Sequence, residues 1–144
     1  MQDLLELGTG QVAFFTGLLA GFSLTAAVHL LRQGLKGFFA HLTFYLFVIT
    51  TLLLFVALYT DVRLTIELAG LKDVPPEAEA LVSKIRTVGT SCATAGFFCF
   101  VVSIGLMGWV ARPFMGVLTT VAAVAAMSVL VYIWRSVFAL QAML

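Results

Sequence analysis

The feature that most constrains this chain is a set of four apolar segments, each long enough to cross a lipid bilayer. They cover residues 11–31, 38–60, 88–111 and 114–134. A spanning α-helix needs about 20 mostly apolar residues, because each residue advances the helix by about 1.5 Å and the hydrocarbon layer is about 30 Å thick. The sequence therefore predicts an all-α protein with four transmembrane helices.

The composition agrees with a protein that lies almost entirely in the membrane. Of its 144 residues, 62% are hydrophobic and 10% are charged, against about 45–50% and about 25% in an ordinary soluble domain. The net charge is +1 and no basic run occurs, so nothing points to a nucleic-acid partner. We expect the outer surface of the helices to contact membrane lipid.

Short turns join the first helix to the second and the third to the fourth. Residues 32–37 contain Gly34 and Gly37, which suit a tight turn. Pro113 can open the last helix, because proline fits the first helical position. Both turns are too short to fold separately, so they are expected to lie on one side of the membrane.

The connection between the second and third helices is longer and predicts a hairpin outside the bilayer. Helical periodicity continues beyond the second span and resumes before the third. The predicted helices cover about residues 11–31, 38–69, 75–111 and 114–140. A helix over 75–111 would be roughly 55 Å long, so helices two and three should extend beyond the bilayer together. We expect Val62, Ile66, Leu81 and Ile85 to hold this hairpin; the alternative is a flexible polar loop.

Lysine and arginine predict the orientation, because cytoplasmic loops carry the excess of these residues. Five lie on the hairpin side and three on the short-turn side: Arg63, Lys72, Lys84, Arg86 and Arg135 against Arg32, Lys36 and Arg112. Both termini and the hairpin are therefore expected in the cytoplasm. The N-terminus lacks the basic region of a signal peptide, so the first helix should be retained. We expect a multi-pass protein of a plasma membrane or a bacterial inner membrane.

The spans contain no carboxylate, which argues against proton-coupled transport through a carboxylate relay. All seven acidic residues lie at positions 3, 6, 61, 67, 73, 77 and 79. The chain also has no Ser-His-Asp set, no phosphate-binding glycine loop and too few cysteines and histidines for a structural zinc site. The sequence therefore predicts no enzyme, no metal site and no cofactor.

The first helix carries the candidate functional residues, Leu18, Phe22, Thr25 and His29. They recur every three or four residues and so share one face of a helix. We call this set the stripe. An ionisable residue inside a span is costly and marks a functional site by default, although an interfacial histidine bonded to headgroups or a carbonyl explains His29 equally. On the same helix, Gly17 and Gly21 form a GxxxG pattern that permits close helix packing.

A second interpretation of His29 involves His41, because both histidines flank the first short turn. Two neutral imidazoles can ligate haem iron, and the chain has two histidines in all. His41 stands at the start of the second helix, where an interfacial histidine is the simpler explanation. A b-type haem anchor is therefore the least favoured alternative.

From residue 17 to residue 29 the first helix reads GLLAGFSLTAAVH. This segment resembles the pore-lining first helix of the Orai calcium channels, which has a leucine pair, a small residue, Gly-Phe, small and apolar residues and then Val-Glu. The four spans, the short turns after the first and third, and the extended second and third helices are similar too. The Thr50-Thr51 pair falls where that family has a similar pair.

The resemblance implies a homo-oligomer in which the first helix is innermost and the stripe faces a pore. Leu18 and Phe22 would form a hydrophobic constriction that gates by dewetting. The family's selectivity glutamate is replaced by His29, and its basic N-terminal residues are replaced by Asp3 and Glu6. Anion passage or pH gating is then as plausible as calcium conduction. The competing interpretation is a non-conducting scaffold or accessory subunit that packs through the same small-residue faces.

Overall fold

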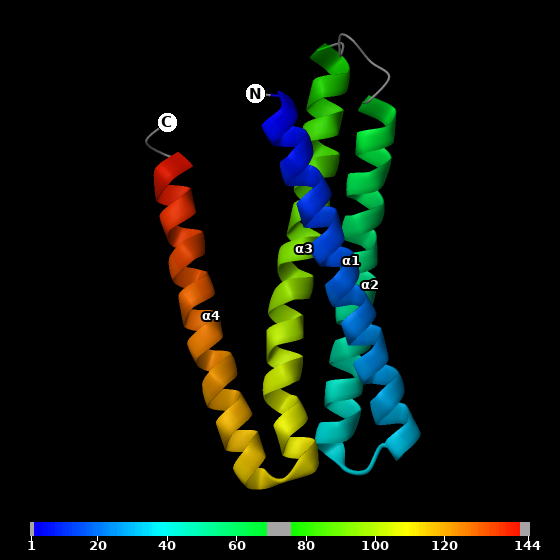
Figure 1. Cartoon of the computed structure of the whole chain (residues 1–144), viewed down its shortest axis with the longest axis vertical. Coiled ribbons are helices and arrows are strands. Elements are labelled where there is room, and N and C mark those ends of the chain that lie inside the picture. Colours follow the sequence, from blue (N-terminus) through cyan, green and yellow to red (C-terminus); the bar gives the residue numbers. More distant parts are fainter. Residues whose placement is uncertain (1, 69–75, 142–144) are drawn as a thin grey trace.

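Four α-helices make up the computed structural model, which describes residues 2–68 and 76–141 (Figure 1). They are α1 (Gln2–Gln33), α2 (Phe38–Leu68), α3 (Pro76–Ala111) and α4 (Pro113–Gln141). Each contains a stretch long and apolar enough to cross a membrane. The predicted all-α architecture with four helices is confirmed for the described residues, and its properties are those of a multi-pass integral membrane protein.

The helix boundaries agree with the sequence at the short turns and differ at the N-terminus. Gly34 and Gly37 have φ of +79° and +86°, a conformation that glycine adopts without steric cost. Pro113 is the first residue of α4, as predicted. Helix α1 begins at Gln2 rather than at residue 11, because the helix continues through polar residues that a search for apolar spans leaves out.

The helices pack in chain order, with α1 on α2, α2 on α3 and α3 on α4. Helix α4 is the least buried of the four. It lies beside α3 at the short-turn end and diverges from it toward the other end (Figure 1). The outer helices α1 and α4 are therefore each packed along one side only.

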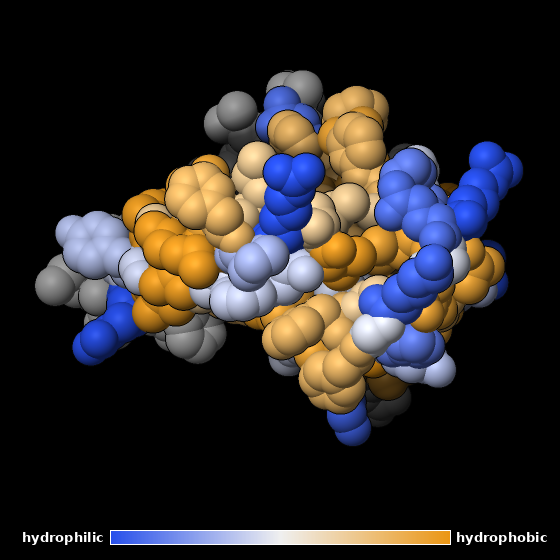
Figure 2. Space-filling model, turned by 90° about the horizontal axis from the view of Figure 1, so that it is seen from below, coloured by the Kyte–Doolittle hydropathy of each residue, from blue (hydrophilic) through white to orange (hydrophobic). Residues whose placement is uncertain are grey.

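Small and apolar side chains bring α1, α2 and α3 together around α2. The buried apolar residues are Ala20, Ala27 and Leu30 of α1, Ala40, Phe47, Leu54 and Ala57 of α2, and Val101 of α3. The ring of Phe47 meets the ring of Phe100 at a centroid distance of 6.3 Å. In lipid such helices associate mainly through van der Waals packing. Many large apolar side chains along the helices are exposed. Seen from the short-turn end, hydrophilic side chains project between broad apolar areas (Figure 2).

Helices α3 and α4 approach so closely that a side chain at Gly108 would collide with α4. A Cβ atom there would lie 2.6 Å from the backbone oxygen of Met115. Thr119 Oγ1 donates a hydrogen bond of 2.9 Å to the backbone oxygen of Gly105, and Trp109 Nε1 donates one of 2.9 Å to Thr120 Oγ1. These contacts between small and hydroxyl residues fix α4 at its N-terminal half.

The predicted packing of the hairpin was wrong in its register. Val62, Ile66, Leu81 and Ile85 are exposed, and the half-buried residues are Leu64 and Val82. The buried face of α2 repeats at three- and four-residue intervals. Continued from Leu54 and Ala57 it reaches Leu64, whereas Val62 and Ile66 lie on another face. The prediction had chosen Val62 and Ile66 because they are apolar, and they lie on a face of α2 that does not pack against α3.

The protrusion of the hairpin stays a prediction that the helix lengths favour. Helix α2 has 31 residues and α3 has 36, which corresponds to roughly 46 Å and 54 Å of helix. Both exceed the hydrocarbon thickness of about 30 Å. The sequence between α2 and α3 lies outside the described residues.

Most hydroxyl side chains in the spans are satisfied by their own helix, with two buried exceptions. Thr16, Ser23, Thr51 and Ser103 donate to the carbonyl four residues earlier, at 2.7–2.9 Å. Among the described residues, the Oγ1 atoms of Thr43 and Thr50 are buried and have no hydrogen-bond partner. Both side chains are 0% exposed. A buried hydroxyl without a partner destabilises the fold.

Replacing Thr50 with valine should therefore stabilise the protein. Valine keeps the shape of threonine and removes the hydroxyl, so the free energy of unfolding should rise by about 1–3 kcal/mol. Thr51→Val is the matched control, because Thr51 Oγ1 already donates to the Phe47 carbonyl at 2.8 Å and its loss should not stabilise. Thermal melting in detergent measures both. A lower melting temperature for Thr50→Val would mean that its hydroxyl has a partner.

The orientation is tested by placing single cysteines on opposite sides. With Cys92 and Cys99 replaced, a cysteine at Lys36 should react with an impermeant thiol reagent on intact cells. A cysteine at Asp73, between α2 and α3 in the sequence, should react only after the cells are opened. Labelling of Asp73→Cys but not of Lys36→Cys on intact cells would reverse the predicted topology.

Candidate functional site

The structure places the stripe on a side of α1 that no other described helix covers. Leu18 and Phe22 are 44% and 57% exposed, and Thr25 and His29 are exposed as well. The buried residues of α1 are Thr16, Ala20, Ser23, Ala27 and Leu30. At about 100° per residue, the two sets are centred roughly 150° apart around the helix. Helix α1 thus packs on α2 with one face and presents the stripe on the other.

The polar end of the stripe forms an open groove near the short turn. The groove has a volume of about 320 Å³ and is lined by Leu24, Thr25, Val28, His29 and Arg32. Among the residues that the structure describes, its lining contains a guanidinium group and no carboxylate. The groove therefore carries positive charge, which favours anions over cations.

The His29 imidazole is held by a neighbour on the same helix. Gln33 Nε2 lies 2.8 Å from His29 Nε2, within hydrogen-bond distance. One turn earlier, Thr25 Oγ1 donates to the Gly21 carbonyl at 2.8 Å. The sequence-based reasoning missed Gln33, although its spacing of four residues from His29 was a usable signal.

The two glycines of the GxxxG pattern have different surroundings. A Cβ atom at Gly17 would lie 3.7 Å from Leu58 of α2, whereas one at Gly21 would meet nothing within 4 Å. Gly17 thus makes an ordinary contact inside the chain, and Gly21 contributes to the uncovered side of α1. Close packing against a partner helix stays a prediction for this pair.

His41 is bonded at the start of α2, consistent with a helix-start histidine. Its Nδ1 donates to the Gly37 carbonyl at 2.9 Å, and the side chain is exposed. Among the described residues, no group of three or more histidine, cysteine or acidic side chains is placed to hold a metal ion. Since the hydrogen bonds of His29 and His41 both stay within their own helix or turn, the geometry does not single them out as a haem pair.

Comparison with known proteins assigns no relatives to the chain: it matches no protein-family model, no curated protein and no solved structure. The resemblance to the Orai channels accordingly rests on the residues of α1 and on the arrangement of four helices along the sequence.

Proposed function

We propose that this chain assembles into a homo-oligomeric ion pore lined by α1. The observation that carries the proposal is the stripe of Leu18, Phe22, Thr25 and His29 on the uncovered side of α1, opposite the side that packs on α2. A ring of identical chains would bring these residues together around an axis, because most homo-oligomers have closed cyclic or dihedral symmetry.

Contact with lipid is unfavourable for the polar end of the stripe. Thr25, His29 and Arg32 line one groove, and polar or ionisable side chains inside a membrane almost always face a protein interior or a water-filled cavity. Assembly around an axis supplies such a cavity. Gly21, with open space beside it, would let a neighbouring helix approach closely.

The stripe divides into a gate and a mouth. Rings of Leu18 and Phe22 would exclude water and close a narrow pore by dewetting. His29 and Arg32 would lie about two to four turns further along, near the short turn. Because the mouth is basic and the spans hold no carboxylate between Leu7 and Thr60, the proposed pore would favour anions or respond to pH rather than select calcium.

A single preparation distinguishes the pore from its alternatives. The purified protein is reconstituted in nanodiscs for particle mass and visible spectrum, and in planar bilayers for current. A ring of identical chains that conducts supports the proposal. Silent monomers, or particles that carry other subunits, would favour the scaffold or accessory subunit, and a Soret band would favour the haem anchor.

A further inference from the structure

Helix α3 carries a second groove, which lies on another helix than the proposed pore stripe. It has a volume of about 700 Å³, and all eight residues that line it belong to α3: Ser83, Arg86, Thr87, Thr90, Ser91, Thr94, Ala95 and Phe98. These residues form two parallel ridges in which each member follows the last by four positions. One ridge is Ser83, Thr87, Ser91 and Ala95, and the other is Arg86, Thr90, Thr94 and Phe98.

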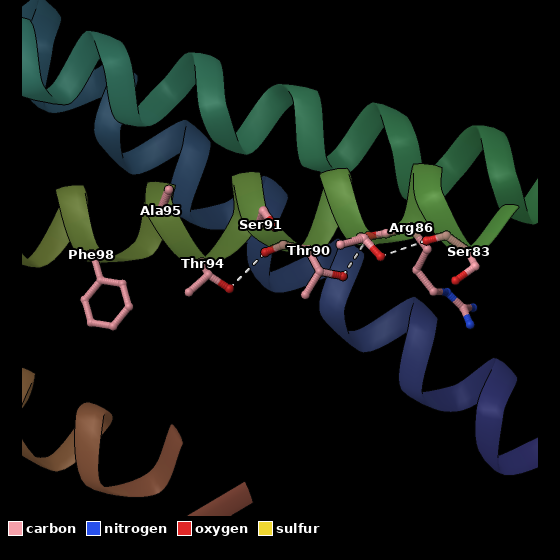
Figure 3. Close-up of a pocket in the computed structure, with 8 residues that line it drawn as sticks. Ser83, Arg86, Thr90, Ser91, Thr94, Ala95 and Phe98 are labelled. Carbon is pink, nitrogen blue, oxygen red and sulfur yellow. Dashed lines mark hydrogen bonds between the residues drawn. The ribbon is translucent and has the colours of Figure 1, made fainter. Parts of the chain in front are cut away.

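Both ridges change from polar to apolar in the same direction along the helix. Figure 3 shows Arg86, Thr90, Thr94 and Phe98 on the side of α3 that faces away from α2. The charged group stands at one end and the aromatic ring at the other. The groove lies toward the end of α3 from which α4 has diverged (Figure 1).

A membrane positioned by Trp109 would match this gradient. Trp109 lies three residues before the short turn at Arg112, and tryptophan is enriched at membrane interfaces. Counted back from an interface at Trp109, about 20 residues of helix would cross the hydrocarbon layer and reach Thr90. Arg86 would then lie about 6 Å further out, at the depth of lipid headgroups, and Phe98 would lie within the hydrocarbon. The groove would thus run from the headgroup layer into the acyl-chain region.

The charged donor in the lining of the groove is Arg86. Thr87, Thr90 and Thr94 each donate to the carbonyl four residues earlier at 2.9 Å, so their hydroxyl hydrogens are used within α3. Among the side chains that the structure describes, the Arg86 guanidinium is exposed and no carboxylate lines the groove. An arginine in this setting matches a phosphate group in charge and geometry.

We propose that this groove binds an anionic phospholipid of the hairpin-side leaflet. The phosphate would accept hydrogen bonds from Arg86, beside Ser83 and Thr87. The glycerol region would lie along Thr90 and Ser91. An acyl chain would run past Ala95 and Phe98, where the threonine hydroxyls folded back on the helix leave methyl groups toward the chain.

Native mass spectrometry of the purified protein, titrated with phosphatidylglycerol in detergent, tests this site. Arg86→Gln should weaken binding about tenfold, because a hydrogen bond to a charged group contributes that much. Lys84→Gln is the matched control: it removes the same charge from the same helix at an exposed position outside the groove lining. Ala95→Trp should fill the acyl end and also weaken binding without changing the charge.

Three further outcomes of the titration would overturn the proposal. Equal loss of phosphatidylglycerol in Arg86→Gln and Lys84→Gln would show general electrostatic attraction only. Displacement of the lipid by millimolar inorganic phosphate would show a site for free anions. A change in particle mass in place of lipid occupancy would show that the groove holds a second copy of the chain. Diacylglycerol, which lacks the phosphate, should bind wild type and Arg86→Gln alike.

Discussion

Replacing Phe22 with serine should raise the ion conductance of the reconstituted protein about tenfold, equivalent to lowering the barrier to permeation by about 1.4 kcal/mol. Phe22 is 57% exposed on the uncovered side of α1. In the proposed assembly the Phe22 side chains of all the chains surround the pore and exclude water at its narrowest point. A ring of hydroxyl groups would hold water there and let ions pass with their hydration shells. Single-channel recording in planar bilayers measures the change.

Phe55→Ser on α2 is the matched control for Phe22→Ser. Phe55 is 50% exposed, so both substitutions remove a similarly exposed ring from the apolar surface, but Phe55 does not belong to α1. Its current should equal that of wild type. If wild type and Phe22→Ser are both silent while the protein remains folded and oligomeric, the pore should be abandoned in favour of the scaffold. Equal gains from both substitutions would point to general leakage rather than a gate.

The parts of the fold that the sequence predicted are those governed by local rules. Four apolar stretches define four helices, because lipid leaves the backbone no other hydrogen-bond partners. Gly34, Gly37 and Pro113 mark the short turns through their own backbone preferences. The common face of Leu18, Phe22, Thr25 and His29 follows from helical periodicity alone, and the structure adds that α2 does not cover it.

The errors and omissions concern packing between helices, which a single sequence specifies less directly. Residues 61–67 carry apolar side chains on more than one face of the helix. Periodicity alone therefore could not decide between Val62 and Ile66 on one face and Leu64, which is half-buried on α2, on another. The α3 groove left a clearer signal, in the four-residue spacing from Ser83 to Ala95 and from Arg86 to Phe98. Hydroxyl residues can satisfy themselves within a helix, so only the position of Arg86 in the structure gives that spacing a functional meaning.

The largest effect of pH should come from His29, because histidine is the side chain that ordinarily changes charge between about pH 5 and 8. The Nε2 atom of His29 lies 2.8 Å from Gln33 Nε2. Protonation of His29 adds one positive charge to each chain of the assembly. It also makes both nitrogens of the imidazole hydrogen-bond donors. For an anion pore, the positive charge should increase current as the pH falls; for a cation pore, it should decrease it. The sign of the change therefore reports the sign of the permeant ion.

Three substitutions isolate this effect. His29→Ala should abolish the pH dependence over that range, while His41→Ala should leave it intact; His41 is the remaining histidine, and it is bonded to the Gly37 carbonyl. His29→Glu should shift the reversal potential toward cations, because a ring of carboxylates attracts them. Reversal potentials in asymmetric salt give ion preference independently of the number of open pores. If His29→Ala keeps the wild-type pH profile and His29→Glu keeps the wild-type reversal potential, then His29 does not face the conducting path and α1 does not line it.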